Sequence, residues 1–168
     1  MLDTLPTRLA DRSRLANENT IVGNNGPVVV WLKSSLRVQE NPALDVGRIL
    51  ASQNDLPLLV YQAIDERYPW ASLRHHNMLL DGAVDLHHGC EALGIKYVLH
   101  VAREGNRQPV MDFFAEEASC IITDLFPLPP LSLIHISEPT RRRGISDAVF
   151  CIKKKRGRGG GGGGGGGG

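Results

Sequence analysis

Short apolar runs alternate with helical patterns along residues 27–130. Four runs rich in Val, Ile and Leu are typical of strands buried on both faces, and they cover residues 28–32, 56–63, 95–101 and 120–125. Three segments between them have the spacing of amphipathic helices, at residues 43–53, 72–93 and 109–118. Strands that alternate with helices predict right-handed crossovers and a parallel sheet. We therefore expect an α/β fold, a Rossmann-like three-layer domain with a parallel sheet of about four or five strands and helices on both faces.

Residues 131–168 differ in composition from the rest of the chain. They combine two basic clusters with an unbroken glycine run from Gly159 to Gly168. The stretches LSLIHISEPTR and ISDAVFCIKKK resemble a translated sequencing adapter, and every residue from Lys153 onward can be encoded with A and G alone. We therefore interpret residues 131–168 as a non-native, adapter-derived and disordered tail. The alternative is a genuine basic tail that binds phosphates or anionic lipid.

The charge of the chain changes sign once this tail is set aside. The tail holds eight of the 19 Lys and Arg residues and two of the 18 Asp and Glu residues, which leaves 11 basic and 16 acidic residues in 1–130. That part has no electrostatic footprint for DNA. We expect residues 1–26 to form a flexible leader, and residues 27–130 to form one truncated α/β domain with a single core.

Cysteine spacing and hydropathy exclude several classes of protein. Cys90 and Cys120 lie far apart, which indicates neither a disulfide framework nor a zinc site, and we expect both to be buried free thiols. No apolar run reaches the roughly 20 residues of a membrane span, and the N-terminus lacks the apolar core of a signal peptide. The expected protein is cytoplasmic and has no membrane partner.

Several motifs that bind nucleotides or metals are missing from the sequence. No G-x-G-x-x-G follows the first strand, and neither a G-x-x-x-x-G-K-[ST] loop nor a G-x-S-x-G elbow is present. Two histidine pairs, His75–His76 and His87–His88, lie on the longest predicted helix. His76 and His87 are 11 residues apart, so a helix rises roughly 16 Å between them. Metal–nitrogen bonds of about 2 Å cannot bridge that distance. We expect surface histidines and no metal site.

The most informative segment is WLKSSLRVQENPAL, residues 31–44. A strand runs into a loop with two basic residues, and an Asn-Pro pair then opens a helix. The segment resembles the first signature of the DNA photolyase/cryptochrome family, commonly W-F-R-R-D-L-R-x-x-D-N-P-A-L. Seven residues match it in register: Trp31, Leu36, Arg37, Asn41, Pro42, Ala43 and Leu44. Ser34 and Ser35 depart from the signature, and Ser35 replaces the aspartate of the family.

The resemblance continues over most of residues 27–130. Residues 71–101 are similar to the second helix and third strand of the family, and with IITDLFPLPP at 121–130 they lean toward its class II branch. The resemblance implies an N-terminal antenna-type α/β domain, which holds a folate or deazaflavin antenna chromophore in many members. It also implies that FAD and damaged DNA bind to a C-terminal helical domain that is missing here. That domain is the expected partner, DNA is reached only through the full-length protein, and the full-length protein is expected to be a monomer.

The resemblance and the strand ends together select the candidate site residues. We expect cofactor-binding roles for Trp31, Lys33, Arg37, Asn41 and Asp124, and no catalytic residue in this fragment. Ordinary structural roles stay open for three of them: Trp31 as a core residue, Asn41 as a helix cap, and Asp124 as the cap of the following turn.

The resemblance implies a light-harvesting domain fragment of a deoxyribodipyrimidine photolyase, inactive by itself. In such an enzyme reduced, light-excited FAD transfers an electron to a pyrimidine dimer in DNA, which splits. Two alternatives stay open: a fragment of a cryptochrome-type blue-light sensor, and a nucleotide-binding module like an electron-transfer flavoprotein domain.

Overall fold

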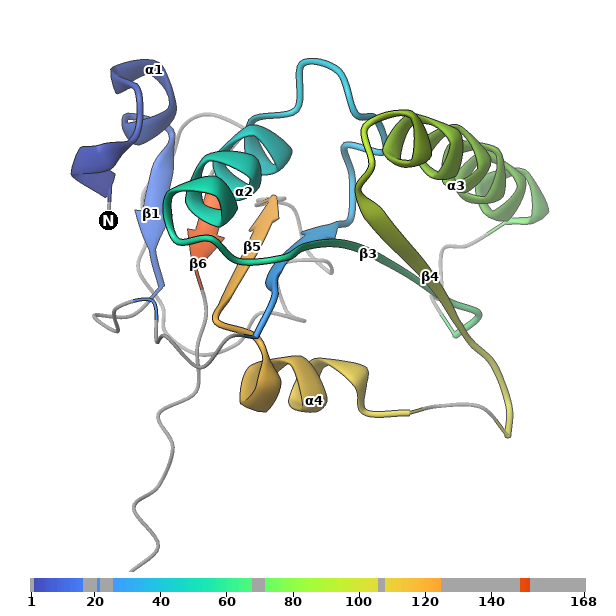
Figure 1. Ribbon diagram of the computed structural model, residues 1–168. Helices are drawn as coiled ribbons and strands as arrows, with labels where there is room; N and C mark the ends of the chain where they lie inside the picture. The colour runs from blue at the N-terminus through green and yellow to red at the C-terminus, as the bar shows by residue number, and fades with distance from the viewer. Residues whose placement is uncertain are drawn as a thin grey trace, which may run out of the picture.

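The structure, a computed structural model, describes residues 2–16, 21, 26–67, 72–105, 108–124 and 149–151. Its strands form one sheet in the order β1-β6-β5-β2-β3-β4 (Figure 1). The strands are β1 (Ser13–Leu15), β2 (Val28–Leu32), β3 (Leu58–Asp65), β4 (Lys96–Ala102), β5 (Cys120–Asp124) and β6 (Val149–Cys151). The helices are η1 (Leu2–Thr4), α1 (Thr7–Ala10), α2 (Pro42–Gln53), α3 (Leu73–Ala92) and α4 (Val110–Glu117).

The four central strands confirm the predicted α/β fold. β2 pairs in parallel with β3 on one side and with β5 on the other, and β3 pairs in parallel with β4. The chain goes from β2 outward to β3 and β4, and then returns past β2 to β5. The strand order therefore reverses between β2 and β5. In open α/β sheets such a reversal opens a crevice beyond the carboxyl ends of the strands.

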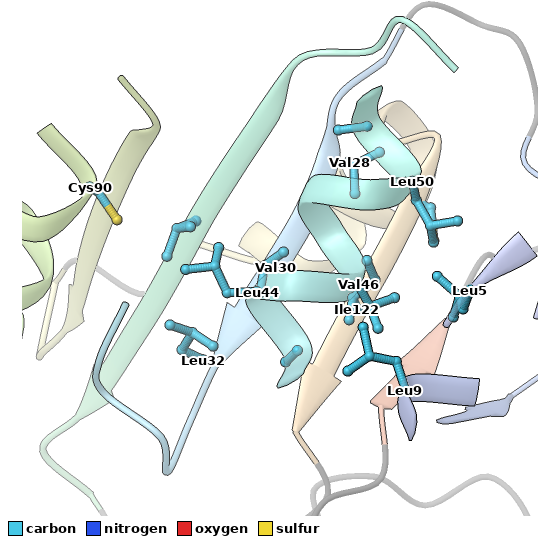
Figure 2. Packing of buried hydrophobic residues seen from close by; sticks show 14 of the residues in the cluster. Leu5, Leu9, Val28, Val30, Leu32, Leu44, Val46, Leu50, Cys90 and Ile122 are labelled. Carbon is cyan, nitrogen blue, oxygen red and sulfur yellow. The ribbon is translucent and has the colours of Figure 1, made fainter. Parts of the chain in front are cut away.

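The alternating side chains of β2 divide the interior into two cores. Val28, Val30 and Leu32 point into the larger cluster, where α2 covers the sheet, and all three are fully buried (Figure 2). Val29 points into the smaller cluster with Phe114 of α4. Because both faces are covered, β2 carries an unbroken apolar run. Figure 1 shows α2 and α3 on the face opposite to α4, which is the predicted three-layer arrangement.

Local signals in the sequence set the bounds of the two longer helices. Asn41 caps α2 by accepting a hydrogen bond from the backbone N–H of Leu44, and Ser72 caps α3 in the same way. Gly94, just after α3, has a φ of +67°, the left-handed conformation that glycine adopts at a helix C-terminus. None of the helices in the described ranges is both long enough and apolar enough to cross a membrane.

The prediction of a flexible leader over residues 1–26 was wrong for its first half. Residues 2–15 form η1, α1 and β1. Leu5 and Leu9 are buried at 7% and 4% exposure, in the same cluster as Val46 of α2 (Figure 2). Burial of two leucines offsets the conformational entropy that ordering this segment costs. A helix of four residues is too short to show the periodic pattern that would predict it firmly.

The expected disordered tail also differs from the structure in one place. Val149–Cys151 forms β6, which pairs antiparallel with β5 and parallel with β1. The rest of residues 131–168 lies outside the described residues.

Cys90 is the buried free thiol that was predicted, but Cys120 is disulfide-bonded, so that prediction was wrong for Cys120. Sequence spacing could not reveal this, because a disulfide depends on contacts between distant parts of the chain.

Candidate functional site

The crevice at the reversal of strand order is built by the end of β5 and the loop that joins β2 to α2. Asp124, the last residue of β5, is only 6% exposed. Its carboxylate accepts hydrogen bonds from the backbone N–H groups of Lys33 at 3.0 Å, Ser34 at 2.8 Å and Ser35 at 3.2 Å. The hydroxyl of Ser34 donates to the same carboxylate. Asp124 therefore fixes the start of the loop.

Asn41 fixes the other end of this loop. Its side-chain amide donates to the carbonyl oxygens of Ser35 at 3.0 Å and Arg37 at 2.8 Å, while its oxygen accepts from the N–H of Leu44. The residue is 1% exposed. All of these contacts are internal, so Asn41 is a helix cap and an organiser of the loop. The structure brings it to the site without presenting its side chain to solvent.

Arg37 lies on the outer side of the loop. Its guanidinium donates to the carbonyl oxygens of Gln39 at 3.1 Å and Glu40 at 3.2 Å. Glu40 has a φ of +48°, a backbone conformation that costs a non-glycine residue energy. The guanidinium bonds help to hold this turn. Arg37 remains exposed and keeps further donors for a partner.

Trp31 and Lys33 lie next to each other where β2 leads into the loop, and Trp31 packs against the smaller core cluster. The Lys33 ammonium is 4.6 Å from the centroid of the Trp31 ring, within the range of a cation–π contact. Burial lowers the pKa of Lys33 to about 8, although the nearby negative charge of Asp124 acts in the opposite direction. An amine with a pKa of about 8 is partly deprotonated just above neutral pH.

Beside the loop lies an open groove of about 890 Å³. Its lining comes from the loop and from the first two thirds of α3: Ser34, Leu36, Leu73, Arg74, Asn77, Met78, Asp81, Gly82 and Asp85. None of the five predicted site residues lines it, although Lys33 and Arg37 are sequence neighbours of its loop residues. The pattern of α3 in the sequence predicted only which residues face the core. The groove lies on the side of α3 that faces away from the core. The residues there are largely exposed to solvent, so they show no apolar periodicity that would indicate a site.

Two glycines let the loop lie close against α3. A Cβ atom at Gly82 would stand 3.0 Å from Leu36, and one at Gly89 would stand 2.7 Å from a methyl carbon of Val38. Larger side chains at these helix positions would push the loop away. The shape of the groove therefore depends on small residues two turns apart on α3.

The carboxyl ends of β3 and β4 form a separate polar region. Asp65 pairs with Arg67 at 2.9 Å within an exposed turn. On the face that carries α4, the Tyr61 hydroxyl lies 3.1 Å from Nδ1 of His100. No group of three or more His, Cys, Asp or Glu side chains in the described part of the chain could hold a metal ion.

Two curated proteins named deoxyribodipyrimidine photo-lyase are similar to this chain. The one from Methanothermobacter thermautotrophicus is 30% identical over 98 residues, which are 58% of this chain and 21% of that protein. The one from Arabidopsis thaliana is 30% identical over 105 residues, which are 61% of this chain and 21% of that protein. The chain is related to the photolyase family. It spans about one fifth of the length of these relatives. No family model matches the chain.

The photolyase relationship agrees with the resemblance at residues 31–44. In the structure that segment is the end of β2, the loop held by Asp124 and Asn41, and the first turn of α2. Binding roles for Trp31, Lys33, Arg37, Asn41 and Asp124 stay predictions. Sequence reasoning missed Ser34, whose amide and hydroxyl both bind Asp124, because it departs from the photolyase signature.

Proposed function

We propose that this chain is the N-terminal light-harvesting domain of a deoxyribodipyrimidine photo-lyase. The observation that carries the proposal is the similarity to two proteins of that name, combined with a parallel sheet whose switch-point loop has the photolyase-like sequence. The protein is proposed to be cytoplasmic. A C-terminal helical domain encoded downstream would bind FAD and DNA, and the reduced, light-excited flavin would supply the electron that splits a pyrimidine dimer.

In this proposal the α/β domain binds an antenna chromophore, a folate or a deazaflavin, in the groove beside the β2–α2 loop. The groove volume of about 890 Å³ suits a drug-sized ligand, since such pockets measure roughly 300–1,000 Å³. Leu36 and Met78 offer apolar contacts for a ring system, and Arg74 and Asn77 offer donors for its polar edge. The residues present therefore fit a flat heterocycle. The bound chromophore would absorb light and pass on the energy.

The five predicted site residues divide into two roles in this proposal. Asp124 and Asn41 are positioning residues, because their polar atoms hold the loop that forms one wall of the groove. Lys33 and Trp31, at the start of the loop, are proposed to contact a ligand edge or the helical domain. Arg37, exposed on the outer side of the loop, would pair with a carboxylate or carbonyl oxygens of the helical domain.

The first experiment is to amplify this locus from the source DNA and sequence it past codon 130. The proposal expects the reading frame to continue into a helical domain of several hundred residues, in place of the adapter-like residues. The full-length protein should then split pyrimidine dimers under blue light. A full-length protein that binds FAD and repairs no dimers would instead be the cryptochrome-type sensor. A genome that encodes residues 131–168 as they stand would contradict the adapter interpretation.

Chromophore binding can be tested on the chain itself. Fluorescence titration with a folate and a deazaflavin should detect binding, and Met78→Glu should weaken it because it brings a charge to an apolar wall. Val84→Glu is the matched control, because Val84 is exposed to a similar extent on the same helix, 55% against 58%, and does not line the groove. Equal loss in both variants would contradict binding in the groove.

A further inference from the structure

We infer that Asp124 acts as a specificity-determining residue that closes the switch point of the sheet to phosphate groups. The inference rests on the proposed function only in taking this end of the sheet as the ligand site. It adds the class of ligand that the crevice rejects. In nucleotide-binding α/β proteins the first strand leads into a loop whose backbone N–H groups receive phosphates. Here the N–H groups of the corresponding loop already bind an anion, which is the carboxylate of Asp124.

The hydrogen-bonding geometry supports this assignment. The N–H groups of three consecutive residues, Lys33, Ser34 and Ser35, converge on one carboxylate within 3.2 Å. Consecutive amides that converge in this way form a concave anion-binding nest. The Ser34 hydroxyl adds a fourth donor. A phosphate at this position would use the same four donors, so it cannot bind while the carboxylate is there.

The carboxylate cannot easily move aside for a phosphate. Asp124 is the last residue of β5, and its strand neighbour Thr123 pairs with Trp31 of β2. Asp124 is only 6% exposed, so a carboxylate that moved out of the nest would lose its hydrogen-bond donors without gaining contact with water. A phosphate beside it would also bring two negative charges together in a partly buried place. Both effects oppose the entry of phosphate.

The ligand class follows from this arrangement. The crevice should reject mononucleotides and dinucleotides whose phosphates would need the nest. It should accept a ring system that has no phosphate at this point. The neutral or carboxylate groups of such a ligand would reach Lys33 and Trp31, or the neighbouring groove. This argues against the nucleotide-binding module that resembles an electron-transfer flavoprotein domain.

The test compares Asp124→Ala with the unmodified full chain. Inorganic phosphate is titrated, and the melting temperature reports binding, because a ligand that binds only the folded state raises it. We expect no saturable shift for the unmodified chain. Asp124→Ala should be less stable without phosphate and should gain a saturable upward shift. Its apparent dissociation constant for phosphate should be at least about tenfold below the highest phosphate concentration at which the unmodified chain shows no saturable shift. Asp112→Ala, which removes an exposed carboxylate of α4, is the matched control and should gain nothing.

Acetate supplies a second arm, because it restores the missing carboxylate. It should also raise the melting temperature of Asp124→Ala and leave that of Asp112→Ala unchanged. A folded Asp124→Ala that gains neither phosphate nor acetate binding would overturn the inference. If the variant does not fold, the unmodified chain decides the question through its backbone amide NMR signals. Saturable shifts of the Ser34 and Ser35 amides with phosphate would overturn the inference, and unchanged shifts support it.

These outcomes are separate from those that test the proposed function. The phosphate experiment uses neither a chromophore nor DNA, so it can succeed in a protein that is no photolyase. Conversely, a chromophore could bind in the groove of a protein whose nest accepts phosphate. Dimer repair by the full-length protein therefore leaves the role of Asp124 to be decided by the phosphate titration.

Discussion

Val38 lies directly against Gly89, so that a Cβ atom at position 89 would stand 2.7 Å and 2.9 Å from the two methyl carbons of the valine. Val38 belongs to the β2–α2 loop and Gly89 to the last third of α3. The contact fixes the spacing between the loop and the helix. Closer to the groove, Leu36 of the same loop packs against Gly82 of α3 in a similar way.

Gly89→Ala should therefore destabilise the protein, although alanine favours a helix by about 1 kcal/mol relative to glycine. Overpacking costs typically about 1–3 kcal/mol, so a net loss of up to about 2 kcal/mol in the free energy of unfolding is expected. Urea denaturation measures it. The double variant Val38→Ala/Gly89→Ala removes the clash and should recover most of the loss that Gly89→Ala causes. A Gly89→Ala protein that is more stable than the original would show that the loop moves freely.

Asn41→Ala should cost more than the loss of an ordinary helix cap. A lost cap costs about 0.5–2 kcal/mol, and here two donated hydrogen bonds to the loop carbonyl oxygens are lost as well. We expect a loss of about 2–4 kcal/mol in the free energy of unfolding. Asn41→Ser is the matched control, because a serine hydroxyl still caps a helix, carries no charge and lacks the two amide donors. Its stability should lie between those of the original protein and Asn41→Ala. Equal stability of the two variants would mean that the donated hydrogen bonds, and not the cap, account for the loss.

The sequence predicted the parts of the fold that depend on local patterns. The run VVVWL became β2 with the predicted bounds, and Asn41 capped α2 as its type and position indicated. The contacts of Asp124 could not be predicted in this way, since they join the end of β5 to a loop that is about 90 residues earlier in the chain. The sequence showed a carboxylate at a strand end. Only the order of the strands shows that it lies beside the amides of residues 33–35.

The burial of Lys33 predicts an unusual dependence of stability on pH. Its pKa is about 8 in the folded protein and 10.5 as the ordinary value, so between these values the unfolded chain binds more protons. The Lys33 contribution to the free energy of unfolding should therefore rise as the pH increases from about 8 toward 10, and Cys90, whose thiol pKa is raised by burial, opposes part of this rise. Burial raises the pKa of Tyr61 and of Tyr97 to about 12, so above pH 10 the folded state binds more protons and stability should fall.

Lys33→Met should abolish the rise between pH 8 and 10, because methionine keeps the length of the side chain and cannot titrate. The rise itself should amount to about 1–2 kcal/mol, less than the full pKa difference would give, because Lys33 is only partly buried. Lys96→Met is the matched control, since Lys96 is exposed on β4. Urea denaturation at several pH values measures all three proteins. A rise that persists in Lys33→Met would assign it to another group.

Tyr97→Phe should be costly because Gln62 depends on the tyrosine hydroxyl. The hydroxyl donates to Oε1 of Gln62 at 2.7 Å, and Gln62 is 1% exposed in the layer between α3 and the sheet. Removing the donor leaves a buried oxygen without that bond, which costs about 1–3 kcal/mol. Replacing both partners with apolar groups, as in Gln62→Met/Tyr97→Phe, leaves no such oxygen and should recover part of the loss. Thermal and urea denaturation of the four proteins in this cycle give the coupling energy, and additive losses would show that the two side chains do not depend on each other.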